Sequence, residues 1–342
     1  MRFDRGRDQD AAARAVASDV LEVLRDWGVR HVFICPGTTE AAFLDASLGQ
    51  RDVEIVLATH ESVAVAMADG YSRATGEPSV AYLHTNVGLG NGLSHLAAAR
   101  LARSPVTVLN GLKPAVIQAH GGFTTAPHTR DLVRQYVKHD WQSLTADTVA
   151  EDVTRALRIA TTEPTGPTWV GLGQDLMEAP GGGTPTAARF RVAAATRPDP
   201  GAVAEAGALL AAAQRPVLVA GSEVARHGAW PLLVELAELI GAPVVNEDRR
   251  TLERTGFPTD HPQFAGTYDV TGPAVADCDV AFFVGARCFV EFEPPGRPNV
   301  PSGARVIHSH VDPQEIGRIY GIDVALVGDE RLVVADVLEH LR

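Results

Sequence analysis

The stretch "VLATHESVAVAMADGYSRATGEPSVAYLHTNVGLGNG", residues 56–92, joins an apolar strand, a helix of small residues, a second apolar strand and a glycine-rich segment. Short, fully apolar strands that alternate with helices are typical of a parallel sheet covered on both faces. Ligands of such sheets bind beyond the carboxyl ends of the strands. The residues that directly follow each strand are therefore the candidates for a functional site.

The same alternation fills both halves of the chain. The chain has 342 residues, a length that favours two domains. Apolar strands alternate with helical patterns over residues 1–178, and the alternation resumes over residues 199–342. Residues 179–198 are rich in glycine, proline, alanine and threonine, as is typical of an interdomain linker. We therefore predict the α/β class, with two doubly wound parallel-sheet domains joined by this linker.

Composition excludes several partners. Lys and Arg total 30 against 42 Asp and Glu, a net charge of -12, whereas a nucleic-acid or anionic-membrane partner needs a basic face. Cys35, Cys278 and Cys288 show neither a C-x-x-C spacing nor a metal-ligand pattern, and are typical of reduced thiols. The charged start has no apolar run behind it, and no stretch reaches transmembrane length. We expect a cytoplasmic protein without a nucleic-acid partner, a membrane partner or a metal site of its own.

Glu61 follows the first of these strands and begins the helix of small residues. An acid in the first turn of a helix complements the helix dipole, which would explain it without any function. The helix is mostly small and apolar, so its first turn is expected to be buried, and a buried carboxylate needs a partner. A ring nitrogen is such a partner, and the residues alone leave both interpretations open.

Gly88, Gly90 and Gly92 follow the next strand. A dinucleotide-binding fingerprint fits poorly, because the third glycine is misplaced and no acid ends the following strand. A turn that needs positive φ, or a close approach of the backbone to a ligand, is the simpler prediction.

Taken together, three segments carry a family resemblance. "GVRHVFICPGTTE", "THESVAVAMADGYSRATGEPSVAYLHT" and "GLGNGLSHLAAARLARSPVTVLNG" resemble the N-terminal pyrimidine-binding domain of thiamine diphosphate-dependent enzymes. The second half, from "RPVLVAGSEVARHGAWPLLVELAELIGAPVV" to "HSHVDP", is similar to their central, Rossmann-like domain. Within this family the chain looks most similar to the branch with benzoylformate decarboxylase, although such chains also resemble acetolactate synthases. His84 stands where acetolactate synthases have Thr or Ser, which favours the decarboxylase side.

The resemblance implies decarboxylation of a 2-oxo acid, carboligation, or both, with thiamine diphosphate as cofactor. The family's glutamate that matches Glu61 hydrogen-bonds N1′ of the aminopyrimidine ring and favours the imino tautomer, which removes the thiazolium C2 proton. His84 matches an active-site histidine. The implied catalytic residues are thus Glu61 and His84; the cofactor-binding residues are Pro36, Gly37, Glu61, Gly88 and Asn91; the substrate-binding residues are Thr38, His84, Gln118 and His120.

Several of these residues have simpler explanations. His84 could be a polar residue at a strand end, Thr38 a helix N-cap, and Gln118 and His120 solvated loop residues. Some relatives have a second catalytic histidine in the central domain, about where this chain has Phe292. Proton transfer or the substrate is therefore expected to differ.

Full-length family members also carry a third domain, which holds the diphosphate through Mg²⁺ with a G-D-G motif. The sequence ends at Arg342, where that domain would begin. We therefore expect a diphosphate-binding domain on a separate partner subunit, which supplies the Mg²⁺ site in an α2β2 heterotetramer. The alternatives are an acetolactate synthase-like carboligase subunit and a non-catalytic regulatory or binding protein. A nucleotide-binding second domain is a third alternative, although "VAGSEV" is only a modest glycine turn and FAD is not expected.

Overall fold

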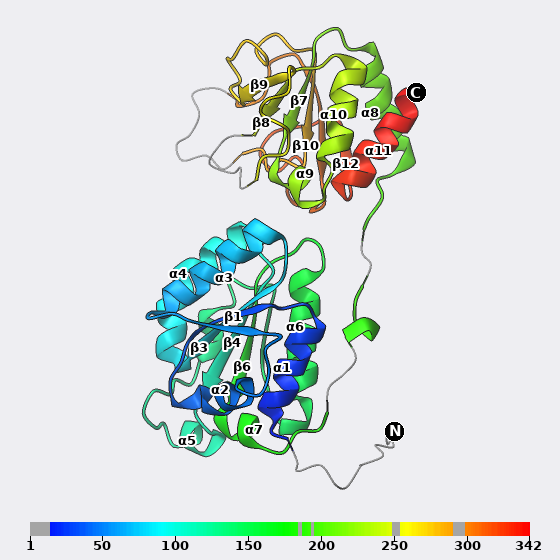
Figure 1. The fold of residues 1–342 in the computed structure, drawn as a ribbon. Helices are drawn as coiled ribbons and strands as arrows, with labels where there is room; N and C mark the ends of the chain where they lie inside the picture. The colour runs from blue at the N-terminus through cyan, green and yellow to red at the C-terminus, as the bar shows by residue number, and fades with distance from the viewer. Residues whose placement is uncertain (1–13, 184–186, 193–194, 248–253, 290–297) are drawn as a thin grey trace. The chain divides into compact units, whose positions relative to one another are not determined.

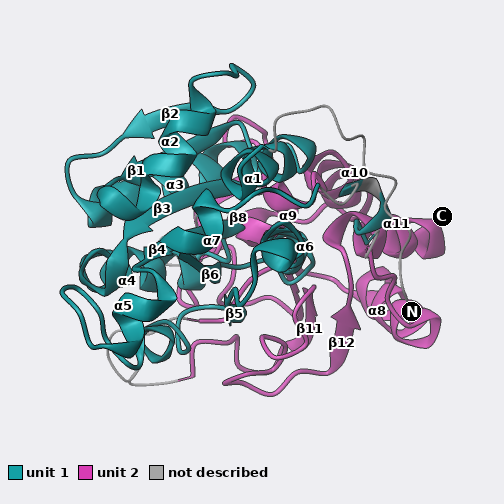
Figure 2. Cartoon of the chain, turned by 90° about the horizontal axis from the view of Figure 1, so that it is seen from below, with its two compact units in different colours: residues 1–192 teal, residues 193–342 magenta. Residues whose placement is uncertain are grey.

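The computed structural model describes residues 14–183, 187–192, 195–247, 254–289 and 298–342. They form two compact units, residues 1–192 and 193–342 (Figure 1, Figure 2). Each unit contains a six-stranded sheet whose neighbouring strands are all parallel. The predicted α/β class with two parallel-sheet domains is confirmed.

The first sheet has the strand order β2-β1-β3-β4-β6-β5. From β1 the chain runs outward to β2 and then returns to β3 on the other side, so the topological switch point lies between β1 and β3. The strands are β1 (His31–Cys35), β2 (Glu54–Leu57), β3 (Ser79–His84), β4 (Val106–Leu112), β5 (His139–Gln142) and β6 (Thr168–Gly173).

Side chains of the first sheet alternate between two apolar cores. Val32 and Ile34 of β1 join the core under α1, α2, α6 and α7, whereas Phe33 joins the core under α3 and α4. This alternation explains why the strands are apolar throughout. The helices are α1 (Val16–Asp26), α2 (Ala41–Ser47), α3 (Glu61–Thr75), α4 (Thr85–Leu101), α5 (Ala115–Ala119), α6 (Val149–Thr161) and α7 (Gln174–Glu178); a 3-10 turn, η1 (Thr38–Glu40), precedes α2.

Asp69, in the middle of α3, fixes the packing of α3 and α4. Its buried carboxylate accepts hydrogen bonds from Arg73 Nε at 2.9 Å and from Ser104 Oγ, beyond the end of α4, at 2.5 Å. The Asp-Gly-Tyr and Ser-Pro motifs of the sequence are therefore structural in this unit, and they set the distance between the two helices that carry Glu61 and Asn91.

Part of the segment predicted as a linker packs on the first unit. Gly183 N donates to Asp19 Oδ2 at 3.0 Å, Ala187 is buried, and the Arg191 guanidinium lies over the Trp27 ring. The division between the units falls at residues 192 and 193, inside the segment 179–198.

The second sheet has the order β12-β11-β10-β7-β8-β9. Its switch point lies between β7 and β10. Helices α8, α10 and α11 cover one face, and residues around Tyr268, Phe289 and Tyr320 cover the other. The elements are α8 (Pro200–Ala212), β7 (Pro216–Ala220), α9 (Ser222–Arg226), α10 (Trp230–Ile240), β8 (Val244–Asn246), β9 (Phe264–Thr267), β10 (Val280–Val284), β11 (Arg305–His310), β12 (Val324–Val327) and α11 (Glu330–Leu341). No helix in the described part of the chain combines the length and apolar character that crossing a membrane requires.

Glu330, the first residue of α11, makes the stability of the second unit depend on pH. It is fully buried, and its Oε2 accepts a hydrogen bond from Ser309 Oγ at 2.6 Å. Burial raises the pKa of this carboxyl to about 8. A carboxyl whose folded pKa lies above its unfolded value costs stability as pH rises from the unfolded pKa to the folded one.

We therefore expect Glu330→Gln to weaken the loss of stability between pH 5 and pH 8. The free energy of unfolding of the wild type should fall relative to the variant by on the order of 3–4 kcal/mol over that interval. Urea unfolding at several pH values measures the difference. Glu339→Gln, an exposed position on the same helix, is the matched control and should follow the wild type. Parallel pH profiles for wild type and Glu330→Gln would contradict the prediction.

Candidate active site

Thr39, Glu40 and His84 meet at the switch point of the first sheet. Pro36 and Gly37 lead from β1 into η1, and His84 ends the neighbouring strand β3. Glu40 is fully buried; its Oε2 accepts from Gly37 N at 2.7 Å and lies 3.0 Å from His84 Nδ1. Its Oε1 accepts the hydroxyl proton of Thr39 at 2.5 Å. A buried carboxylate with three donors is fully satisfied.

The hydrogen bonds of this cluster fix the tautomer of His84. Thr39 Oγ1 lies 2.9 Å from His84 Nδ1, and its own proton points to Glu40, so this oxygen accepts from Nδ1. Glu40 Oε2, a carboxylate oxygen, also only accepts. The proton of the ring therefore lies on Nδ1, and Nε2 is left to bind another group.

Two glycines make this cluster possible. A Cβ on Gly37 would lie 2.5 Å from His84 Nδ1, and a Cβ on Gly111, in β4, would overlap Glu40 Oε1. Register places Gly111 directly beside His84 across β3 and β4. Gly37 and Gly111 are therefore required by the close packing of the His84, Thr39 and Glu40 side chains.

Glu61 is the first residue of α3, and His60 caps the helix with its Nδ1 accepting from Ser62 N at 3.2 Å. Asn91 Nδ2 donates to Glu61 Oε2 at 3.0 Å. Oε1 accepts no hydrogen bond from the described residues. The prediction of a buried carboxylate is wrong: Glu61 is half-buried, because only α4 covers it at this edge of the sheet.

The predicted glycine turn after β3 is also wrong. Helix α4 begins at Thr85, directly after the strand, and Gly88, Gly90 and Gly92 all lie inside it. Positive φ occurs at Thr85, with φ 52°, and at none of these glycines. Gly88 and Gly92 instead allow α4 to approach α3: a Cβ on Gly88 would lie 2.9 Å from Glu61 Oε1, and one on Gly92 would lie 3.1 Å from Val65 Cγ2.

Cys35 is the last residue of β1 and feels the charges of both carboxylates. Burial raises the pKa of its thiol, and the negative charges of Glu61 and Glu40 raise it further. Glu40 and Glu61 follow β1 and β2, so both lie at the carboxyl edge of the sheet. The thiol stays protonated at neutral pH and is no nucleophile.

Of the other predicted residues, Thr38 joins this edge and His120 does not. Thr38 is the first residue of η1, so Gly37 and not Thr38 is the N-cap, and its Oγ1 accepts from Lys113 Nζ at 3.1 Å. Gln118 Nε2 donates to the carbonyl of Lys113 at 2.6 Å. His120 ends α5 and is exposed, and its ring makes no hydrogen bond or ion pair with the described residues.

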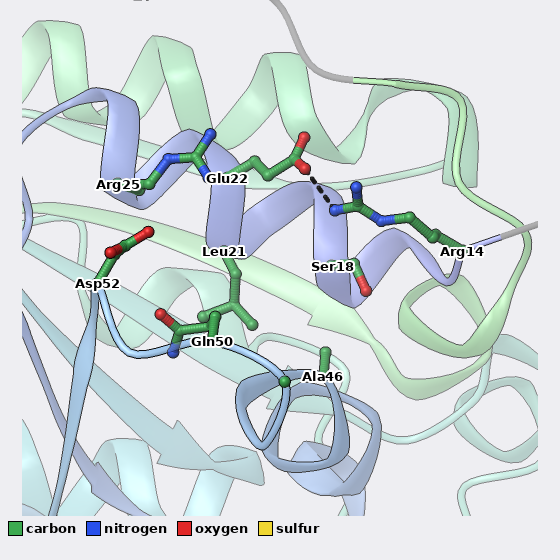
Figure 3. A pocket seen from close by; sticks show the side chains of 9 residues that line it. Arg14, Ser18, Leu21, Glu22, Arg25, Ala46, Gln50 and Asp52 are labelled. Atoms are coloured by element: carbon green, nitrogen blue, oxygen red, sulfur yellow. Dashed lines mark ion pairs between the residues drawn. The ribbon is translucent and has the colours of Figure 1, made fainter.

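A surface groove of about 320 Å³ lies apart from these residues (Figure 3). The groove is lined mainly by residues of α1 and of the connection between α2 and β2. This connection leads to the amino-terminal end of β2, so the groove lies at the edge of the sheet opposite to the candidate site. Arg14 and Glu22 pair across it at 2.5 Å. The groove contains none of the predicted site residues.

The described residues hold no group of three or more His, Cys, Asp or Glu side chains that could bind a metal ion. Phe292, where some relatives have a histidine, lies outside the described residues.

Comparison with known proteins identifies both units. Residues 14–132 match the family model of the thiamine pyrophosphate enzyme N-terminal TPP binding domain, and residues 203–340 match that of the central domain. The "Probable acetolactate synthase large subunit" of Methanocaldococcus jannaschii is 31% identical over 340 residues, which cover 95% of this chain and 56% of the relative. Benzoylformate decarboxylase of Pseudomonas aeruginosa is 31% identical over 335 residues, 96% of this chain and 62% of the relative.

Solved structures agree with these relatives. Benzoylformate decarboxylase from Polynucleobacter necessarius superposes with a TM-score of 0.87 at 27% identity, covering 96% of this chain and 61% of that one. The chain thus spans roughly three fifths of the length of the relatives it matches. Two successive domain models of one family, matched in order over two sheets of the expected topology, show that the chain belongs to the thiamine pyrophosphate enzymes.

Proposed function

We propose that this chain supplies the pyrimidine-binding half of the active site of a thiamine diphosphate-dependent enzyme that acts on a 2-oxo acid. The reaction is decarboxylation, carboligation of the product, or both. The observation that carries this proposal is Glu61 at the start of α3, with one carboxylate oxygen held by Asn91 and the other without a hydrogen-bond donor among the described residues.

The residues around Glu61 fit the pyrimidine end of thiamine diphosphate. Gly88 has no side chain beside Oε1, where a Cβ would come within 2.9 Å. A half-buried carboxylate with one open oxygen can hydrogen-bond a ring nitrogen and share a proton with it. The proposal extends the cofactor contacts to Pro36, Gly37 and Asn91, which lie on the segments around the switch point.

When bound, thiamine diphosphate supplies the electron sink for cleavage of the bond between the carbonyl carbon and the carboxylate. Glu61 holds a proton at the ring nitrogen of the aminopyrimidine. His84 Nε2 accepts or donates a proton at the substrate, because Glu40 and Thr39 fix Nδ1 as a donor. Glu40 is thus a positioning residue for His84.

We further propose that a partner subunit with a diphosphate-binding domain holds Mg²⁺ and completes the site, in an α2β2 assembly. What supports it is the family: the relatives continue beyond the region that matches this chain, which covers 56% and 62% of their length. A cytoplasmic location stays a prediction.

The purified chain alone is expected to bind thiamine diphosphate weakly or not at all, and no better than it binds thiamine. The diphosphate contributes most of the charge-assisted binding energy, and the proposal assigns its site to the partner subunit. Calorimetry with Mg²⁺ and each ligand measures both affinities. Adding the partner should tighten the binding of thiamine diphosphate but not the binding of thiamine. Micromolar binding of thiamine diphosphate to the chain alone would refute the proposal that this chain holds only the pyrimidine end of the cofactor.

The glycine after β7 gives no support to a nucleotide site in the second unit. Gly221 follows β7 at the switch point, but a Cβ on it would overlap the backbone of Gly285, which follows β10. The glycine therefore serves the packing of two strand ends. No phosphate cradle is needed to explain it.

A further inference from the structure

Lys113 brings an isolated positive charge to the candidate site. It follows β4 directly, and among the described segments 35–40, 58–61, 84–91, 113–118 and 173–175, which follow β1, β2, β3, β4 and β6, it is the only lysine or arginine. The same segments carry the carboxylates of Glu40, Glu61 and Asp175. An anionic substrate that enters this edge of the sheet therefore meets one cation and several negative charges.

The ammonium of Lys113 is held in place but not neutralised. Nζ donates to Thr38 Oγ1 at 3.1 Å, and no carboxylate of the described residues lies within ion-pair distance of it. Asp175 is engaged elsewhere, since its Oδ2 accepts from Ala115 N at 3.1 Å. An ammonium has three donors, so two remain for a ligand.

The backbone of Lys113 is fixed as well. Gln118 Nε2 donates to its carbonyl at 2.6 Å, and Gln142 Nε2 lies 3.4 Å from Gln118 Oε1. Gln118, predicted to bind substrate, thus holds the residue that presents the charge.

Strand register places Lys113 beside the His84 cluster. Gly111 lies opposite His84, and Lys113 is two residues further along the same chain segment. Thr38, bound to Lys113, and Thr39, bound to His84, are consecutive residues of η1. The cation and the imidazole therefore flank one short turn.

We propose that Lys113, together with the hydroxyl of Thr38, binds the carboxylate of the 2-oxo acid substrate and so sets the preference for acids over uncharged carbonyl compounds. This inference rests on the proposed function. Two charge-assisted hydrogen bonds from Nζ would hold the carboxylate near η1, away from Glu61, and leave the carbonyl oriented toward the interior of the site. Thr38 alone would offer one neutral hydrogen bond without charge compensation.

The test compares Lys113→Met, which keeps chain length but removes the charge, with Lys113→Arg, which keeps the charge. In the assembled enzyme, with benzoylformate and pyruvate as probes, we expect Lys113→Met to raise KM by about 10- to 100-fold, the range of a hydrogen bond to a charged group. The kcat should change less than threefold, and Lys113→Arg should recover most of the loss. Condensation of benzaldehyde, which has no carboxylate, should be unaffected by either variant.

A second readout does not depend on turnover. The cofactor-free assembly is titrated with benzoylformate and with its methyl ester. Lys113→Met should bind the acid more weakly than the wild type does, and should bind the ester equally well. Equal KM and equal acid binding in wild type and Lys113→Met would overturn the inference and leave the proposed function intact. Equal losses for acid and aldehyde, or no recovery by Lys113→Arg, would also overturn it. Failure of the wild type to convert any 2-oxo acid would refute the proposed function, and the titration would still decide whether Lys113 binds a carboxylate.

Discussion

Replacing Glu61 by glutamine is expected to slow exchange of the C2 proton of bound thiamine diphosphate by on the order of 10²-fold or more, the usual effect of losing an acid–base group. The amide keeps the size of the side chain and can still bond Asn91, which lies 3.0 Å from Oε2. It cannot pass a proton to the aminopyrimidine nitrogen. Hydrogen–deuterium exchange at C2, followed by NMR in the complex with the partner subunit, measures the effect.

A thermal melt separates catalysis from a purely electrostatic role of Glu61. As a helix-dipole residue at the start of α3, it would contribute roughly 0.3–1 kcal/mol, and its loss would lower the melting temperature without affecting exchange. Glu151→Gln, in the exposed first turn of α6, is the matched control for that effect. Normal C2 exchange in Glu61→Gln, with a melt like that of the control, would mean that this acid only caps its helix.

Replacing His84 by alanine is expected to lower turnover of the 2-oxo acid by about 10²- to 10⁴-fold, the contribution of a positioned acid or base. Cofactor binding should stay nearly unchanged, since Glu61 and Asn91 lie on α3 and α4 and do not contact the imidazole. Steady-state kinetics and a cofactor titration of the assembled enzyme measure both quantities.

The buried neighbour of His84 complicates the interpretation of that variant. Alanine leaves the Glu40 carboxylate without one of its donors, so lost stability could lower activity indirectly. His84→Gln, which keeps a donor toward Glu40 but cannot exchange a proton, should be equally inactive and fold normally. His128→Ala, at an exposed position that pairs only with Asp131 among the described residues, serves as the control. Wild-type turnover in both His84 variants would return this residue to a structural role.

The sequence was sufficient to predict the sheets, because their strands are short, apolar throughout and separated by helices of regular period. It also singled out Glu61 and His84 as candidates, since Glu61 begins the helix after β2 and His84 ends β3. The glycines of α4 misled the prediction. Each costs about 1 kcal/mol in a helix relative to alanine, so three of them suggested a turn, but close packing of α3 against Gly88 and Gly92 outweighs this preference.

Glu40 and Lys113 could not be recognised from sequence. An acid at the start of a short helix looks the same whether it is exposed or buried, and the burial of Glu40 depends on Gly111 in a different strand. Thr38 and Lys113 are 75 residues apart, and only the pairing of β1, β3 and β4 brings them together. Contacts of this kind depend on strand order, which local patterns do not specify.

The overlap between Gly111 and Glu40 also constrains how this family member can evolve. A side chain at position 111 is incompatible with the present positions of the Glu40 carboxylate and the Thr39 hydroxyl, because its Cβ would overlap both oxygens. The effects of the two positions are therefore not additive, and each determines which substitutions the other tolerates. Loss of the Glu40 carboxylate alone would not free position 111, because the Thr39 hydroxyl would still overlap a Cβ there, so three positions must change together.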